Sequence, residues 1–124
     1  MKALIIEDDP VSIMTLEMML RKLQITSKTA RGVVDAISIL LTYKPEIIFL
    51  DLFLGSNDGL EFLQTRMGNL RLKQIPVVIV SSSSQFDAIN VCLKNGADAY
   101  LIKPVQFNLL VDVLRKLGIP VANQ

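Results

Sequence analysis

The stretch Ile47-Ile48-Phe49-Leu50-Asp51, residues 47–51, decides the fold of this chain. Four consecutive apolar residues are followed by an aspartate, and such an apolar run is typical of a strand that is covered on both faces. Runs of the same kind occur at residues 3–6 and 77–80. Strands that are buried on both faces predict a parallel sheet with helices on either side of it.

Helical patterns alternate with the apolar runs along the chain. Asp9-Pro10 predicts a helix start, because Asp is a good N-cap and proline suits the first helical position. The run at residues 25–29 is more polar than the others and is expected at an edge of the sheet. Five strand–helix units predict an α/β fold with a doubly wound, five-stranded parallel sheet. The expected strands cover residues 3–6, 25–29, 47–50, 77–80 and 99–102, and the expected helices cover residues 10–23, 33–42, 60–68, 85–95 and 107–117.

The composition fits one domain with an ordinary apolar core. The chain has 124 residues, of which 51% are apolar, and its only cysteine, Cys92, excludes an internal disulfide and fits a reducing compartment. The net charge is +1, and no basic stripe indicates direct nucleic-acid binding. No apolar segment is long enough for a signal peptide or a membrane span. We therefore expect a single domain, residues 1–124, that works in the cytoplasm without membrane contact.

Polar side chains follow four of the five expected strands. Acidic residues 7–9 follow the first strand, Asp51 the third, Ser81 the fourth and Lys103 the fifth. Because the carboxyl ends of parallel strands meet at one edge, we expect these groups to share a site. A single acid after a strand is often only a helix cap, but crowded carboxylates repel one another and are costly without a bound cation. Oxygen ligands favour a hard ion, and the chain has no histidine, so the cluster predicts a Mg²⁺ site.

At these positions the sequence resembles the receiver domain of two-component response regulators, over essentially its full length. The spacing is 43 residues from Asp8 to Asp51, 30 from Asp51 to Ser81 and 22 from Ser81 to Lys103, and these intervals match the family. Several positions at matched spacing are far more specific than any one motif. The residues that carry the resemblance are Glu7, Asp8, Asp51, Ser81, Tyr100, Lys103 and Pro104, with supporting segments at residues 58–59 and 95–100.

The resemblance implies a fold, a reaction and a cofactor. The fold is the flavodoxin-like (βα)5 arrangement with strand order 2-1-3-4-5, as in chemotaxis receivers. Asp51 would be the phosphoacceptor and would form an aspartyl phosphate. Asp8, with Glu7 directly or through water, would hold Mg²⁺, and the Asp51 carboxylate and the backbone carbonyl of Phe53 would complete the protein ligands. The metal would neutralise charge on the transferring phosphoryl group.

The resemblance also implies how the site responds to the phosphoryl group. Lys103 would pair with Asp51 and then with a phosphoryl oxygen. Ser81 would hydrogen-bond another oxygen and move toward it, and Tyr100 would swing inward behind Ser81. The Lys103–Pro104 peptide bond is expected to be cis, as in the family.

Four loop positions bear on the kinetics rather than on the chemistry. In the family, the positions held here by Phe53 and Ser83 border the path of attacking water, so both are expected to tune the lifetime of the phosphorylated state. The proline that is usual four residues after the phosphoacceptor is Gly55, and the small residue that is usual after the switch hydroxyl is Ser82. Neither departure removes a reacting group, but Gly55 should make its loop less rigid.

The first expected helix carries apolar residues on two faces. Val11, Met14 and Met18 lie opposite the face that should be core, and methionine is an adaptable contact residue. Because the helix begins at the acidic site, we expect this outer face to dock the phosphodonor, a histidine kinase or a histidine phosphotransfer protein. The expected core face comprises Ile13, Leu16, Leu20 and Leu23.

The favoured interpretation is a stand-alone receiver domain whose output partner the sequence does not name. Without histidine, the chain cannot be its own histidine phosphodonor. The alternatives are a receiver excised from a longer DNA-binding regulator or hybrid kinase, and an interaction module that works without phosphorylation. The complete set of acids, serine and lysine argues against such a module. A phosphatase usually needs a second carboxylate two residues after its catalytic Asp, where this chain has Phe53, so no enzyme acting on an outside substrate is expected.

Overall fold

The strands form one parallel sheet. The computed structural model of the chain describes residues 1–53 and 58–121. Neighbouring strands all run parallel, and their order across the sheet is β2-β1-β3-β4-β5. The expected flavodoxin-like topology is therefore confirmed. The strands are β1 (Lys2–Ile6), β2 (Thr26–Ala30), β3 (Ile47–Asp51), β4 (Val77–Ser81) and β5 (Ala99–Ile102).

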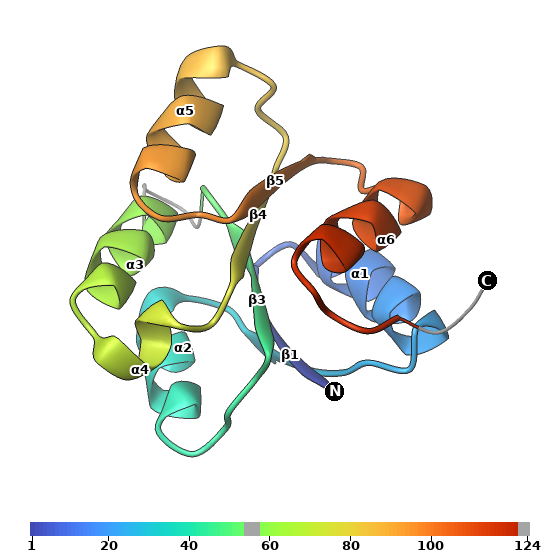
Figure 1. The fold of residues 1–124 in the computed structure, drawn as a ribbon, viewed down its shortest axis with the longest axis horizontal. Helices are drawn as coiled ribbons and strands as arrows, with labels where there is room; N and C mark the ends of the chain where they lie inside the picture. Colours follow the sequence, from blue (N-terminus) through green and yellow to red (C-terminus); the bar gives the residue numbers. More distant parts are fainter. Residues whose placement is uncertain (54–57, 122–124) are drawn as a thin grey trace.

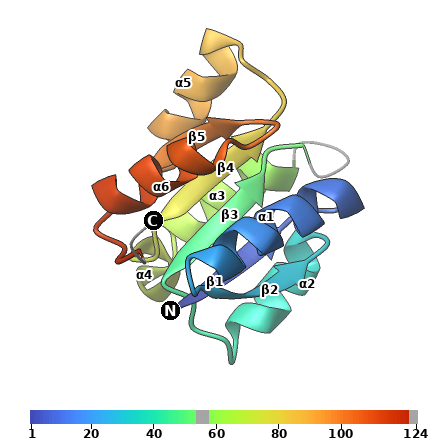
Figure 2. The ribbon, with the colours of Figure 1, turned by 90° about the vertical axis from the view of Figure 1, so that its right-hand side faces the viewer.

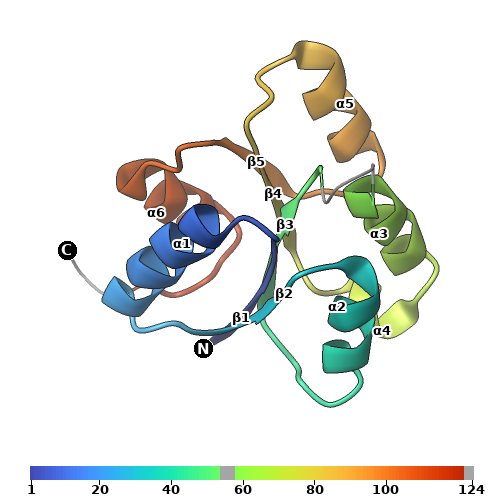
Figure 3. The ribbon, with the colours of Figure 1, turned by 180° about the vertical axis from the view of Figure 1, so that it is seen from behind.

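Helices cover both faces of the sheet (Figure 1). On one face, α1 (Pro10–Lys22) and α6 (Phe107–Lys116) lie side by side, as Figure 2 shows. The other face carries the remaining helices, and in Figure 3 α5 stands farther out than its neighbours. No helix in the described part of the chain combines the length and the apolar character that a membrane crossing requires. The helices of the second face are α2 (Val33–Leu40), α3 (Asp58–Met67), α4 (Leu70–Lys73) and α5 (Phe86–Lys94).

Side chains of the central strands alternate between two cores. In β1, Leu4 and Ile6 join the core under α2 to α5, whereas Ala3 and Ile5 join the core under α1 and α6. Every residue of β3 and of β4 is buried. Burial on both faces explains why these two strands carry a polar residue only at their last position.

Most sequence-based element bounds are confirmed, with small shifts. The polar strand β2 does lie at the sheet edge, one residue later than expected, because the Ile25 N–H bonds to the Leu20 carbonyl at the end of α1. The expected second helix ends at Leu40, because Leu41 and Thr42 donate to carbonyls three residues back in a tighter turn. Gly55 lies outside the described residues. The sequence predicted four core residues for the first helix, and all four are buried in the structure: Ile13, Leu16, Leu20 and, directly after α1, Leu23.

The helix α4 was not expected from the sequence. Its four residues are too few to present a helical period. Asn69 caps the start of the helix, and its Oδ1 accepts the N–H groups of Arg71 and Leu72, each at 3.0 Å. A short polar cap thus fixes an element that hydrophobic patterning does not reveal.

Arg66 of α3 joins three segments next to this helix. It is only 4% exposed, and its guanidinium donates to the carbonyls of Ile75, Lys73 and Gly96 at 2.7 to 3.2 Å. One of its nitrogens lies 3.4 Å from the carboxylate of Asp98. Burial lowers the pKa of Arg66, and the Asp98 charge opposes that shift. Arg66 thereby ties α3 to the segments that lead into β4 and β5.

The strands end at different levels on the carboxyl edge of the sheet. By the strand register, Glu7 leaves β1 level with Asp51 at the end of β3. Ser81 lies one residue beyond the β4 partner of Asp51. Lys103 follows the β5 partner of Ser81 and so lies one residue farther still. We call this arrangement of Glu7, Asp51, Ser81 and Lys103 the stepped edge.

Candidate functional site

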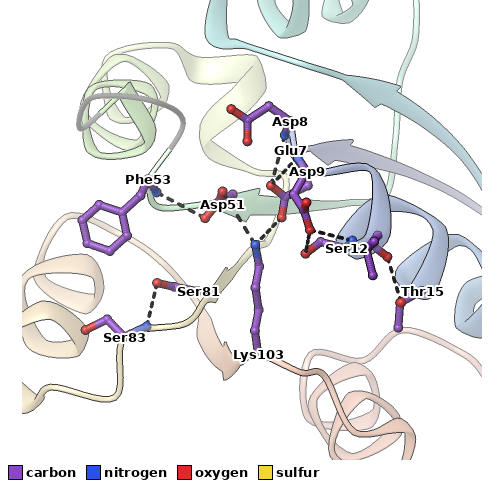
Figure 4. Close-up of polar contacts among 11 residues, drawn as sticks. Glu7, Asp8, Asp9, Ser12, Thr15, Asp51, Phe53, Ser81, Ser83 and Lys103 are labelled. Atoms are coloured by element: carbon purple, nitrogen blue, oxygen red, sulfur yellow. Dashed lines mark hydrogen bonds and ion pairs between the residues drawn. The ribbon is translucent and has the colours of Figure 1, made fainter.

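The polar groups that were predicted to share a site lie together at the carboxyl edge of the sheet (Figure 4). Glu7 and Asp8 come from the loop between β1 and α1, and Asp51 is the last residue of β3. Ser81 is the last residue of β4, and Lys103 follows β5. Parallel pairing of the strands thus brings together residues that are far apart in the sequence.

Three carboxylates form the acidic part of the site. Glu7, Asp8 and Asp51 each offer one oxygen, and these oxygens lie within 4.8 Å of one another. Glu7 and Asp51 are buried, whereas Asp8 is exposed to solvent. An all-oxygen set that is open on one side fits a hard divalent cation such as Mg²⁺, which keeps several waters when it binds.

Glu7 is held by partners on both of its oxygens. Oε2 accepts the backbone N–H groups of Asp8 at 3.0 Å and of Asp9 at 3.2 Å, and Oε1 lies 2.6 Å from the Lys103 ammonium. Burial raises the pKa of Glu7, the Lys103 ammonium opposes this shift, and the neighbouring Asp51 adds to it. The Glu7 carboxylate is therefore a costly buried charge that depends on nearby donors.

Lys103 pairs more closely with Glu7 than with Asp51. Its Nζ lies 3.7 Å from Oδ2 of Asp51, against 2.6 Å from Glu7. The resemblance implied that Lys103 pairs with Asp51. The structure adds Glu7 as a second and closer partner, so both buried carboxylates share this counter-charge. The Lys103–Pro104 peptide bond is cis in the structure.

Ser81 and Tyr100 are connected through the backbone of Ser83. The fully buried Ser81 accepts the Ser83 N–H on its Oγ at 3.2 Å. The Tyr100 hydroxyl donates to the Ser83 carbonyl at 2.7 Å. Ser83 therefore lies between the two residues that the resemblance names as switch groups, although its own expected role was kinetic.

Phe53 contacts the site through its backbone rather than its ring. Its N–H donates to Oδ1 of Asp51 at 3.2 Å. The side chain is 48% exposed, and in Figure 4 the ring points away from the Asp51 carboxylate. The expected roles of Phe53, as a carbonyl ligand and as a barrier to water, stay predictions.

A cavity of about 240 Å³ lies beside the acidic site, on the side of α1. Glu7, Asp51 and Lys103 line it together with side chains of α1 and of residues 104–105. Nothing in the sequence indicated this cavity, because its walls come from three strands, a helix and the segment after β5, and their packing depends on the complete fold.

The outer face of α1 is exposed, as the sequence predicted. Val11 is 72%, Met14 is 61% and Met18 is 53% exposed. Val11 also lines the cavity, so this face reaches the site. Its expected role in docking stays a prediction.

Comparisons with known proteins agree on the family. The model of the response regulator receiver domain matches residues 3–115. The transcriptional regulatory protein AfsQ1 of Streptomyces coelicolor is 32% identical over 107 residues, which cover 86% of this chain and 46% of that protein. The chain spans about half the length of the curated relatives it matches.

Solved structures agree on the fold. The bacteriophytochrome response regulator AtBRR is 30% identical, with a TM-score of 0.83 over 99% of this chain and 96% of its own. The receiver domain of a sensor histidine kinase from Pseudomonas aeruginosa, 23% identical, has a TM-score of 0.82 over 94% of this chain and 97% of its own, and it holds magnesium in its active-site cleft. With its sheet order, its acidic cluster and a family match over nearly the whole length, this chain belongs to the receiver domains of two-component response regulators.

Proposed function

We propose that the chain accepts a phosphoryl group on Asp51 from a histidine kinase or a histidine phosphotransfer protein and thereby switches a surface that controls a partner. The observation that carries this proposal is the setting of Asp51. Its buried carboxylate shares an acidic cluster with Glu7 and Asp8 and lies 3.7 Å from the Lys103 ammonium. A nucleophilic carboxylate between a cation site and a fixed positive charge is suited to an anionic phosphoryl group.

The transfer needs little covalent chemistry from the protein. One carboxylate oxygen of Asp51 bonds to phosphorus as the bond from phosphorus to the donor's imidazole nitrogen breaks, and that electron pair stays on the nitrogen. Glu7, Asp8, Asp51 and the Phe53 carbonyl would hold Mg²⁺, which supplies charge neutralisation for the phosphoryl oxygens. Lys103 would move from Glu7 and Asp51 toward one of those oxygens.

Ser81 and Tyr100 would pass the change to the surface. A phosphoryl oxygen on Asp51 is an acceptor that competes for the Ser81 hydroxyl. When Ser81 moves toward it, the Ser83 N–H loses its acceptor, and the Tyr100 hydroxyl is bonded to the same residue. The proposal therefore includes a joint movement of Ser81, Ser83 and Tyr100 that reshapes α5, β5 and α6.

The deciding experiment is phosphorylation with acetyl phosphate and Mg²⁺, read by intact mass. We expect the parent protein to gain the mass of one phosphoryl group and Asp51→Asn to gain none. Asp112→Asn, at an exposed position of α6, is the matched control and should be labelled like the parent. Labelling of Asp51→Asn would refute the assignment. An unlabelled parent protein would instead favour an interaction module that works without phosphorylation.

The proposal extends to the organisation of the chain. We infer one receiver domain over residues 1–124, acting in the cytoplasm, in which Asp51 is an acceptor and no outside substrate is turned over. The family match over residues 3–115 supports this division. An output module on a longer chain and an output partner on a separate chain are both compatible with it.

A further inference from the structure

The cavity beside Asp51 has an apolar interior. Side chains of the central strands that face α1 and α6 form its floor, namely Ile5, Phe49 and Val80. Thr15 of α1 lines one wall, and Val105, after β5, lines another. Its volume of about 240 Å³ exceeds the roughly 150 Å³ of an engineered apolar cavity that binds benzene. A six-membered ring with a small substituent therefore fits.

The rim of the cavity is charged. Glu7 and Asp51 contribute two carboxylates and Lys103 contributes one ammonium. The Lys103 ammonium serves both carboxylates and lies closer to Glu7, so Asp51 is the less neutralised of the two. Without a bound divalent cation, the rim therefore favours an organic cation over an anion, because an anion would face both carboxylates at low dielectric.

We propose that this cavity binds a small organic cation whose flat apolar body fills the interior and whose amine or amidine group pairs with Asp51 and Glu7. Such a ligand would occupy the space in front of the Asp51 carboxylate and would inhibit phosphorylation. The inhibitory consequence rests on the function proposed for Asp51, whereas the binding itself does not. The site thus differs from the metal site in requiring the apolar interior.

The binding test uses benzamidine, whose ring and amidinium match the interior and the rim. Backbone amide shifts of ¹⁵N-labelled protein are followed during titration without divalent metal. We expect saturable shifts at Ile5, Thr15 and Val105. Benzamide has nearly the same shape without the charge, and methylguanidinium has the charge without the ring. Both are expected to bind at least about tenfold more weakly. Equal binding of either compound, or no saturable binding of benzamidine, would overturn the proposal.

Two variants test the location of the ligand. Thr15→Phe and Val105→Phe fill the cavity from two different segments, and each should weaken benzamidine binding by at least about tenfold. Met14→Phe, on the exposed face of the same helix, is the matched control and should bind like the parent. If one filling variant fails to fold, the other still gives the result. Unchanged affinity in a folded filling variant would place the ligand elsewhere and contradict the proposal.

The inhibition test is labelling by acetyl phosphate at fixed Mg²⁺ with increasing benzamidine. We expect labelling of the parent to fall along the curve of amide shifts recorded at the same Mg²⁺ concentration, because Mg²⁺ competes for the Glu7 and Asp51 carboxylates. Labelling of Val105→Phe should be insensitive to benzamidine. Saturated binding with undiminished labelling would overturn the inhibitory role. A parent that is never labelled, even without benzamidine, would instead refute the function of Asp51 and leave the binding result standing.

Discussion

Gly59, in the first turn of α3, packs directly against the backbone of Asp51. A Cβ atom at residue 59 would lie 2.6 Å from the carbonyl oxygens of both Asp51 and Leu52. Real Cβ atoms do not approach that closely, and backbone atoms at the end of a buried strand have little room to move. The start of α3 therefore helps to fix the position of the proposed phosphoacceptor.

Gly59→Ala should both destabilise the chain and slow its phosphorylation. The added methyl group must displace the end of β3, and overpacking of this kind costs about 1–3 kcal/mol. Gly68→Ala, just after the other end of α3, is the control, because its Cβ would meet only the Thr65 carbonyl at an ordinary 3.7 Å. Urea unfolding and the rate of labelling by acetyl phosphate are the measurements. Equal behaviour of the two variants would mean that β3 tolerates the contact.

Phe53→Asn should shorten the lifetime of the phosphorylated state. Phe53 lies two residues after Asp51, where the family resemblance places the path of attacking water. Its ring points away from the Asp51 carboxylate in Figure 4 and would have to turn over that side of the carboxylate to shield an aspartyl phosphate. Asparagine would open that side and offer hydrogen bonds to water. Loss of phosphate is followed by intact mass after the donor is removed. Phe86→Asn, at another exposed aromatic position, should decay like the parent. If the phosphorylated Phe53→Asn variant lost its phosphate no faster than the parent, Phe53 would not shield the aspartyl phosphate from water.

The outer face of α1 should be needed for transfer from a protein donor but not from a small one. Met14→Glu with Met18→Glu places two charges on an exposed apolar surface that begins at the acidic site. We expect transfer from a phosphorylated histidine phosphotransfer protein to fall at least about tenfold, because charged side chains disfavour an apolar interface. Labelling by acetyl phosphate should be retained.

The control for this pair is Val34→Glu, which changes an exposed apolar residue on α2. It should leave both reactions intact. A double variant that loses both reactions has a damaged fold, and one that loses neither shows that the donor docks elsewhere.

The cap of α1 should make stability depend on pH in the acid range. Asp9 accepts the Ser12 N–H at 3.0 Å and the Ser12 hydroxyl at 2.7 Å, and these bonds lower the pKa of Asp9 below its ordinary value of 3.8. The folded state thus favours the ionised form. Its stabilising contribution is present above pH 3.8 and is lost as the pH falls through the lowered value.

Asp9→Ala is therefore expected to be less stable than the parent at neutral pH, with a gap that narrows below pH 3.8. Asp9→Asn keeps an acceptor oxygen without the charge, so its difference from Asp9→Ala should not change with pH. Urea unfolding across the acid range measures both differences. A constant gap between parent and Asp9→Ala would show that ionisation of the cap has no part in stability.

Arg66→Met should be strongly destabilising although it leaves the proposed site untouched. The substitution removes the donors to the carbonyls of Ile75, Lys73 and Gly96 from part-buried hydrogen bonds. We expect a loss of about 3 kcal/mol, the order found when buried polar groups lose their partners. Arg115→Met, on the exposed side of α6, should change stability little. A small effect of Arg66→Met would mean that water or rearrangement replaces the lost bonds.

The residues at the strand ends could be predicted from the sequence because a parallel sheet fixes where they lie. Once residues 47–51 are read as a buried strand, Asp51 must emerge at the same edge as Glu7, Ser81 and Lys103. Apolar runs and helical periods are sufficient for this level of the fold, and the order of the strands followed from the family resemblance.

Other features of the site and the fold could not be predicted. They depend on contacts between residues that lie far apart in the sequence and that no local sequence pattern connects. The closer approach of Lys103 to Glu7 than to Asp51 depends on how the ends of β1, β3 and β5 are arranged in space. Arg66 looks like an ordinary surface arginine of a helix until its distant carbonyl partners are known. The cavity beside Asp51 exists only where α1, three strands and the segment after β5 meet.

The stepped edge also limits how the length of this chain can change. Side chains alternate along a strand, so one residue added or removed within β4 turns every later side chain of that strand to the opposite face. Ser81 would then lose its place one residue beyond the partner of Asp51, although every residue type of the site remained present. Connecting segments that hold no residue of the site carry no such restriction. Substitutions can therefore adjust this site gradually, whereas insertions and deletions are tolerated only outside its strands.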